Sequence, residues 1–494
     1  LSISAENNLG STPGSTDADN IIFNGGGLAI TSGVTFSANR GVTMTGDGTI
    51  NTASSTTSNL QGIITGSGTL TKAGDCDLIL SGTNTHSGTL AITDGTLVLS
   101  GSLNDSQAVT VSSGATFDTS GDETIGSIAG AGTLDIEHKS QLTVGGDNSS
   151  TIYSGVIQST GSGTGGIIKQ GTGTLTLSGN NTFSGGVTVA AGTIAVTANN
   201  ALGDTTNTTT VQSGATIDFQ NVNYSTTETL RSSGTIATST GTSTFAGGVQ
   251  LLADSDLDVD GTQLTLSGVV SGSSALNKTG NGISILSGTN TYSGNTSITE
   301  GTLRVTGTLN NSTNVTVSSG ATYDVDATDQ VGSIAGAGTI DIASSATLSA
   351  GNSGNTSVSG VVSGSGNLRK LLFISIGRNL SIHSKAVDSL KFRLNSSSPK
   401  LEIQKAISHL SEMQLKITTS TKSSVTKLNS QLTALGKTLD SLSPLKTLDR
   451  GYAVARDSKT KKIISNSEKV SINSQIDIKL AKGEIAAKVT KRKG

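Results

Sequence analysis

Three recurring aspartates are the residues of this sequence best suited to acid–base chemistry. Asp118, Asp218 and Asp324 end the related phrases SSGATFD, QSGATID and SSGATYD. Hydrolysis by a carboxyl pair requires two carboxyl groups held about 5 to 10 Å apart, one of them with a shifted pKa. The repeat sets these aspartates about one hundred residues apart in the chain. We therefore expect them to cap turns rather than to form a catalytic pair.

The other residues with chemical potential stand without partners. Cys76 is the single cysteine, which excludes an internal disulfide framework, and no base recurs beside it. His138 has no second His or Cys at ligand spacing. The stretch GSGTGG, residues 161 to 166, has the spacing of a dinucleotide loop, but no helix pattern follows it. The sequence thus predicts no catalytic residue, no cofactor and no bound metal.

The composition requires an unusual way of burying apolar surface. The chain has 494 residues with 64 glycines, no tryptophan and only 3% aromatic residues. Ordinary globular cores of this length use many more large rings. No stretch approaches the roughly 20 apolar residues of a membrane helix, because the longest apolar run, from Leu371 to Ile376, is short. We expect small repeated units to bury the apolar side chains.

Charge and glycine content divide the chain near residue 370. Up to Lys370 there are 9 basic and 26 acidic residues, and from Leu371 onward there are 23 basic and 9 acidic residues. Of the 64 glycines, 59 lie before the division and 5 after it. The division indicates two unlike polypeptides joined in one chain. Because the chain begins at Leu1 without Met, we expect a fragment or a processed product, and the lack of a signal peptide is uninformative.

The first part is a repeat. Three segments align, namely LILSGTNTHSGTLAITDGTLVLS from Leu78, LTLSGNNTFSGGVTVAAGTIAVT from Leu175 and ISILSGTNTYSGNTSITEGTLRVT from Ile283. Runs such as Thr174 to Leu177 alternate apolar residues with Thr for a few positions and then stop at Gly, Asn or Ser. Short alternating strands stacked in rungs of roughly 20 to 25 residues predict a parallel β-solenoid, or β-helix, over residues 1–370.

A lysine opens each copy, at Lys72, Lys169 and Lys278, so the spacings are 97 and 109 residues. The phrase from Leu78 to Leu97 and its two copies resemble the passenger repeats of bacterial autotransporters. That resemblance implies a structural or adhesive body at the cell surface or in the medium. His86 stands where the other copies have Phe183 and Tyr292, so we expect it at a ring position on the solenoid surface.

After Lys370 the repeat breaks inside a module and helix patterns begin. Apolar residues from Ile376 to Leu394 are spaced by three and four, and a second helix is expected from Lys400 to Leu442. Together they predict a helical hairpin or coiled-coil stalk over residues 371–442. One regular stripe on the second helix is the expected docking surface for a helical partner, and it comprises Val425, Leu428, Leu432, Leu435 and Leu439.

The last residues, 443–494, predict a small β module. Strands are expected at 452–456 and 461–464, followed by a hairpin from Ile476 to Val489 with Lys482 and Gly483 at its tip. The phrase SPLKTLDRGYAVARD, residues 443 to 457, resembles the carboxyl end of the large subunit of exodeoxyribonuclease VII. Its signature residues here are Asp449, Arg450, Gly451 and Tyr452.

That second resemblance implies single-stranded DNA as substrate, small helical subunits as partners and a cytoplasmic location. The catalytic core and the OB-fold of that family lie upstream of the stalk, where this chain has the solenoid. We therefore expect the chain to be inactive by itself as a nuclease. A gene fusion, a frameshift or an assembly error would each explain such a chimera, and the alternative is a surface-exposed or secreted adhesin-like passenger with no nucleic-acid role.

Overall fold

A computed structural model describes residues 1–53, 56–137, 139–161, 164–205, 207–351, 356–370, 385, 387, 400–442, 453–480 and 482–493. The chain divides into two compact units. The first comprises residues 1–360 and 365–370, and the second comprises residues 361–364 and 371–494.

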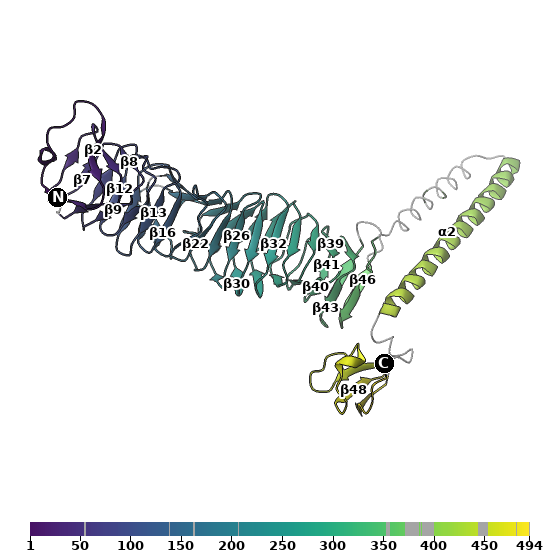
Figure 1. Ribbon diagram of the computed structural model, residues 1–494. Coiled ribbons are helices and arrows are strands. Elements are labelled where there is room, and N and C mark those ends of the chain that lie inside the picture. The colour runs from purple at the N-terminus through teal and green to yellow at the C-terminus, as the bar shows by residue number, and fades with distance from the viewer. Residues whose placement is uncertain are drawn as a thin grey trace. The chain divides into compact units, whose positions relative to one another are not determined.

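The first unit is a parallel β-solenoid, as the sequence predicts. Short strands follow one another around the axis and pair in parallel with the strands of the next turn, and the longest sheet has 17 strands. Figure 1 shows these strands stacked from the purple N-terminal end to β43 (Thr339–Ile342) in green. The next strand in the chain is β44 (Thr347–Ala350). Partners in adjacent turns are separated by about 20 residues in the chain, as between β22 (Thr174–Leu177) and β24 (Thr193–Val196).

The core is a set of aliphatic columns along the axis. Leu175, on β22, pairs in register with Ile194 on β24, and Ile194 pairs with Ile217 on β26 (Thr216–Phe219). All three side chains are buried, and fully burying each contributes about 1.5 to 3 kcal/mol. The neighbouring Thr174, Thr193 and Thr216 face outward, because successive side chains on a strand point to opposite faces. In the alternation of apolar residues and threonines on these strands, the apolar residues Leu175, Ile194 and Ile217 thus face the core and the threonines face the surface.

Glycine is required where the phrase GTL, or GTI in the second copy, opens a strand. Gly95, Gly192 and Gly301 have φ of 63°, 63° and 61°, a region that residues with a side chain rarely adopt. A Cβ at Gly192 would also lie 2.8 Å from Lys169 Nζ. Lys169 and Gly192 therefore lie close together at one tight corner of the chain.

The second unit contains helix α2 (Lys400–Leu442, 43 residues), which confirms the predicted second helix. Of the predicted first helix, 376–394, only Lys385 and Val387 are described, so the predicted pairing of two helices in a hairpin or coiled coil lies outside the described residues.

A three-stranded antiparallel sheet ends the chain, built from β47 (Val454–Asp457), β48 (Gln475–Lys479) and β49 (Glu484–Lys488). The predicted hairpin is confirmed, since Ile476 pairs with Ala487 and Ile478 with Ile485. The expected strand at 461–464 is wrong, because this segment makes one isolated bridge, from Ile463 to Arg456. The sequence KKIISNS, residues 461 to 467, contains only two apolar residues, so this segment has little apolar surface that a strand could bury.

Candidate functional site

The repeated lysines are buried structural groups. Lys278, on β35 (Leu276–Thr279), has no exposed surface, and its Nζ donates to the carbonyls of Thr279 (2.5 Å), Gly280 (2.6 Å) and Glu300 (3.4 Å). Three carbonyl acceptors match the three N–H donors of an ammonium group. Burial lowers the pKa of Lys278 to about 8.

The other two copies repeat this arrangement. Lys72, on β9 (Leu70–Ala73), donates to carbonyls one, two and 22 residues further on, and Lys169, on β21 (Gly166–Lys169), does the same. Burial lowers the pKa of both lysines as well. The last acceptor in each set belongs to the following turn, so each lysine ties two turns of the solenoid together. We call these three residues the lysine clamps.

The asparagine of SGxNTxSG is a second tie between turns. Asn290 accepts from the backbone N–H of Val270 (2.9 Å) and donates to the carbonyls of Gly288 and Thr308 (3.0 Å each). Asn84 makes the same three contacts, and Asn181 accepts from Ile157 and donates to Ala201. Since Val270 lies one turn before Asn290 and Thr308 one turn after it, the side chain spans three turns. The most recognisable residues of the repeat therefore stabilise it and leave no donor for chemistry.

His86 occupies the expected ring position, but the expectation that it lies on the surface is wrong. His86, Phe183 and Tyr292 are all fully buried. Burial lowers the pKa of His86 to about 4, so the ring is neutral near pH 7, and Gln107 Nε2 donates to it. The cause is desolvation of the buried ring, which disfavours the charged imidazolium.

The three recurring aspartates lie on strands and not within the turns themselves. Asp118 is on β14 (Thr116–Thr119), Asp218 on β26 and Asp324 on β40 (Thr322–Val325). Asp218 accepts from the backbone N–H of Ser239 (2.9 Å), one turn further on. Asp218 thus caps a turn as expected, but the turn belongs to the next rung, a relation that sequence spacing alone does not show.

Acidic side chains do meet between neighbouring turns. Asp118 pairs in register with Asp135 on β17 (Thr133–Ile136). Burial, with Glu137 and Asp135 nearby, raises the pKa of Asp118 to about 6. In the third copy Arg304 lies against the equivalent Asp324 (3.2 Å). One carboxyl with a raised pKa on an open sheet face lacks the oriented partner that acid–base catalysis requires.

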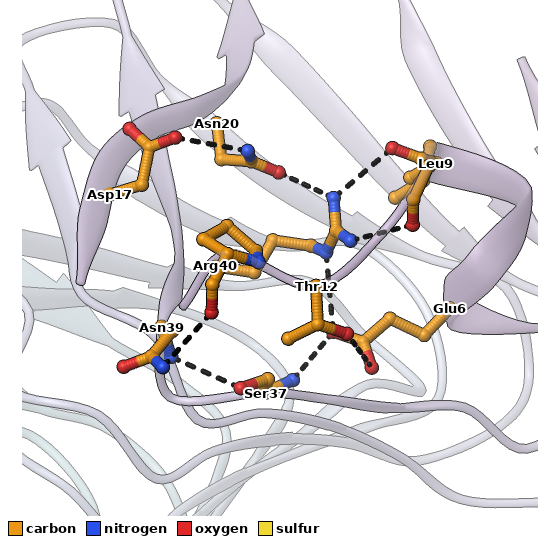
Figure 2. Close-up of polar contacts among 10 residues, drawn as sticks. Glu6, Leu9, Thr12, Asp17, Asn20, Ser37, Asn39 and Arg40 are labelled. Carbon is orange, nitrogen blue, oxygen red and sulfur yellow. Dashed lines mark hydrogen bonds and ion pairs between the residues drawn. The ribbon is translucent and has the colours of Figure 1, made fainter. Parts of the chain in front are cut away.

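A buried arginine closes the N-terminal end of the solenoid. Arg40 begins β5 (Arg40–Met44) and bonds, through Nε, the carboxylate of Glu6 (3.2 Å) on η1 (Glu6–Leu9). Its other nitrogens donate to the carbonyls of Leu9 (3.2 Å) and Gly10 (3.0 Å) and to the Asn20 amide. Figure 2 shows the guanidinium at the centre of these contacts. Arg40 thus fastens the first residues over the first turn, a structural role.

Helix α2 exposes the described part of the expected docking stripe. Val425 and Leu428 are each 39% exposed, and none of the residues 403–430 whose side chains are described is buried. Lys422 and Lys427 are exposed beside them. Leu432, Leu435 and Leu439 continue α2, but their side chains lie outside the described residues. The signature residues Asp449, Arg450, Gly451 and Tyr452 also lie outside them.

No group of three or more His, Cys, Asp or Glu among the described residues is placed to hold a metal ion. No helix among them has the length and apolar character that crossing a bilayer requires. The strand β21 begins at the end of GSGTGG, where a dinucleotide loop would be followed by a helix.

The comparisons with known proteins divide along the same line as the fold. Residues 364–488 match the family model "Exonuclease VII, large subunit". Residues 70–99, 167–196 and 276–305 match the model "Passenger-associated-transport-repeat". Two families therefore have counterparts in this one chain.

Individual relatives agree with both matches. The exodeoxyribonuclease 7 large subunit of Legionella pneumophila (strain Paris) is 30% identical over 126 residues, 26% of this chain and 28% of that protein. The large subunit of Clostridium perfringens (strain SM101 / Type A) is 30% identical over 119 residues, 24% of this chain and 30% of that protein. The adhesin BmaC autotransporter of Brucella suis biovar 1 (strain 1330) is 35% identical over 139 residues, 28% of this chain and 4% of that protein. No solved structure matches.

The chain spans only 28% of the length of the first large subunit that it matches. Each passenger match begins two residues before a lysine clamp, so the matched segments are the turns that the clamps and asparagines hold.

Proposed function

We propose that residues 1–370 form a structural, adhesive body of the passenger kind, joined to the carboxyl end of an exodeoxyribonuclease 7 large subunit that lacks its catalytic core. One observation supports the structural role of residues 1–370. The polar groups of the lysine clamps and the repeat asparagines bind backbone carbonyls and amides between turns, so they serve the fold. The boundaries we propose are 1–370 for the solenoid, 371–442 for the helical arm and 443–494 for the small β module.

The two halves suit different locations. The nuclease-like half suits the cytoplasm, and the passenger-like half suits the cell surface or secretion. The second candidate function is therefore an adhesin-like passenger with no nucleic-acid role, favoured by the match to an autotransporter adhesin.

The chain is expected to leave single-stranded DNA intact. The described residues bring no pair of oriented catalytic groups together and no metal-binding cluster. Purified full-length chain would be incubated with end-labelled single-stranded DNA, with and without Mg²⁺, and the products separated by size. Degradation that disappears when residues 371–494 are removed would contradict the proposal, whereas degradation that persists would indicate a contaminant or a site in the solenoid.

The nuclease-like half is proposed to retain docking of a small helical subunit on α2. Val425 and Leu428 lie three residues apart on one face, and the spacing to Leu432, Leu435 and Leu439 continues that face. An exposed aliphatic stripe on a helix is the usual complement of an apolar groove or a second helix. Lys422 and Lys427 beside the stripe favour an acidic partner, because complementary charges orient the encounter.

Charge on the stripe is expected to weaken this docking at least tenfold. The double variant Val425→Asp/Leu428→Asp would place two carboxylates where apolar contacts form, and co-purification with an exodeoxyribonuclease 7 small subunit would be measured. The matched control, Ser423→Asp/Ser430→Asp, adds the same charge on the opposite face of the helix and should dock normally. Undiminished co-purification of the first variant would show that the docking surface lies elsewhere.

A further inference from the structure

A hollow of about 600 Å³ lies on the solenoid surface at the third copy of the repeat. Four successive turns contribute to it, through Thr289, Thr308, Gln330 and Ser349 among others. Thr289 pairs with Thr308, and Gln330 on β41 (Asp329–Gln330) pairs in register with Ser349 on β44. The lining is therefore two short columns, each of two paired side chains, that follow one another along the solenoid axis. We call it the threonine groove.

The columns present free polar groups on a fixed scaffold. Within the part of the chain that the structure describes, the side chains of Thr308, Gln330 and Ser349 are half-buried and make no hydrogen bond. The residues beneath them are fully engaged. Asp329 accepts from the backbone N–H groups of Leu309 (3.0 Å) and Gln330 (2.9 Å), and Asn290 spans three turns. Hydroxyl and amide groups are thus held at the spacing of the turns, ready to exchange hydrogen bonds with a ligand.

The chemistry of the lining selects one class of ligand. No lysine or arginine lines the groove, and the single charged residue in it is the acidic Asp329, so phosphate or sulfate groups would be repelled. The one aliphatic side chain, Leu309, is buried, which leaves no pocket for an apolar anchor. Hydroxyls and amides that both donate and accept suit a neutral ligand with many hydroxyl groups.

The geometry favours a chain-like ligand. Adjacent turns of a parallel sheet are about 4.8 Å apart, so four turns present their columns over roughly 14 Å. We propose that the threonine groove binds a neutral polysaccharide along the solenoid axis. This inference rests on the proposed adhesive function and names its ligand class.

The test uses the full chain on an array that carries neutral glycans, the anionic glycan heparin, and the proteins fibronectin and collagen. The groove variant Thr308→Val/Gln330→Met removes free hydrogen-bonding groups while preserving side-chain volume. The matched control, Thr176→Val/Gln250→Met, makes the same changes at outward-facing positions of β22 and β31 (Val249–Leu251). We expect neutral glycans to bind, with a Kd at least tenfold higher for the groove variant and unchanged for the control.

Other results would overturn the proposal in distinguishable ways. Binding to fibronectin or collagen with no neutral glycan bound would refute the groove inference and leave the adhesive function standing. Binding to heparin alone, or glycan binding that the groove variant retains, would also refute the inference. No binding to any surface would refute both the inference and the adhesive function.

Discussion

Replacing Lys278 by methionine will destabilise the third repeat by about 4 kcal/mol. Methionine fills nearly the same volume but has no donor, so the buried carbonyls of Thr279, Gly280 and Glu300 lose the ammonium group that binds them. Each unsatisfied buried carbonyl costs about 1 to 3 kcal/mol, and relief of the ammonium's desolvation offsets part of that sum.

Hydrogen exchange is the appropriate measurement, because a solenoid unfolds locally and its turns contact only their neighbours. Amides of β35, β36 (Ile283–Leu286) and β37 (Thr296–Ile298) should exchange several hundredfold faster in the variant. The control is Arg231→Met on β28 (Thr229–Ser232), an exposed cation whose loss should change stability by less than about 0.5 kcal/mol. Equal exchange in both variants would show that the clamp contributes nothing.

The solenoid will be most stable near pH 4 to 5 and will lose stability as the pH rises toward 7. Burial raises the pKa of Glu228, which accepts hydrogen bonds from Thr209 and from Tyr224 (2.8 Å), to about 7. The folded state therefore keeps a proton that the unfolded state releases near pH 4.5. This stabilising contribution is full below pH 4.5 and is lost as the pH rises through 7, by about 3 kcal/mol.

His86 acts in the opposite direction. Its folded-state pKa of about 4 lies below the usual 6.5, so the unfolded state gains a proton first as the pH falls. The contribution of His86 to stability then falls between pH 6.5 and 4, again by about 3 kcal/mol. Raised pKa values of Glu123, to about 7, and Asp329, to about 6, add to the loss at higher pH.

Two conservative variants separate the contributions. Glu228→Gln should flatten the loss between pH 5 and 8 in exchange measurements on β28. His86→Phe, which installs the ring found in the second copy, should remove the opposing contribution between pH 6.5 and 4, so that the region around β11 (Leu90–Ile92) gains more stability as the pH falls. An unchanged pH profile in either variant would show that the buried group does not titrate in this range.

The sequence predicted the solenoid because its signal is local. Thr174 to Leu177 alternates within four residues, and burial on one face follows from that alternation alone. Helix α2 and the hairpin after Gln475 were predicted for the same reason, because apolar residues recur at a short, regular spacing within each element.

The roles of Lys278, Asn290 and Glu228 could not be predicted in this way. Lys278 and Asn290 bind backbone carbonyls and amides in neighbouring turns. Every residue type has a backbone carbonyl, so the sequence does not indicate which carbonyl is the partner. The pairing of Asp118 with Asp135 was missed because Asp118 was compared only with its equivalents about one hundred residues away and not with the residue one rung further on. Glu228 occurs in one copy only, so no recurrence drew attention to it.

The lysine clamps and the repeat asparagines also determine how the solenoid would respond to mechanical force. A load that peels the strands one turn at a time breaks the backbone ladder of each turn, and at a clamp it must also break the bonds by which the ammonium joins two turns and the amide three. Those turns must then yield together. The three copies would therefore resist unfolding one after another along the solenoid axis. A stretched molecule would lengthen in steps of one repeat, and the remaining repeats would stay folded under tension.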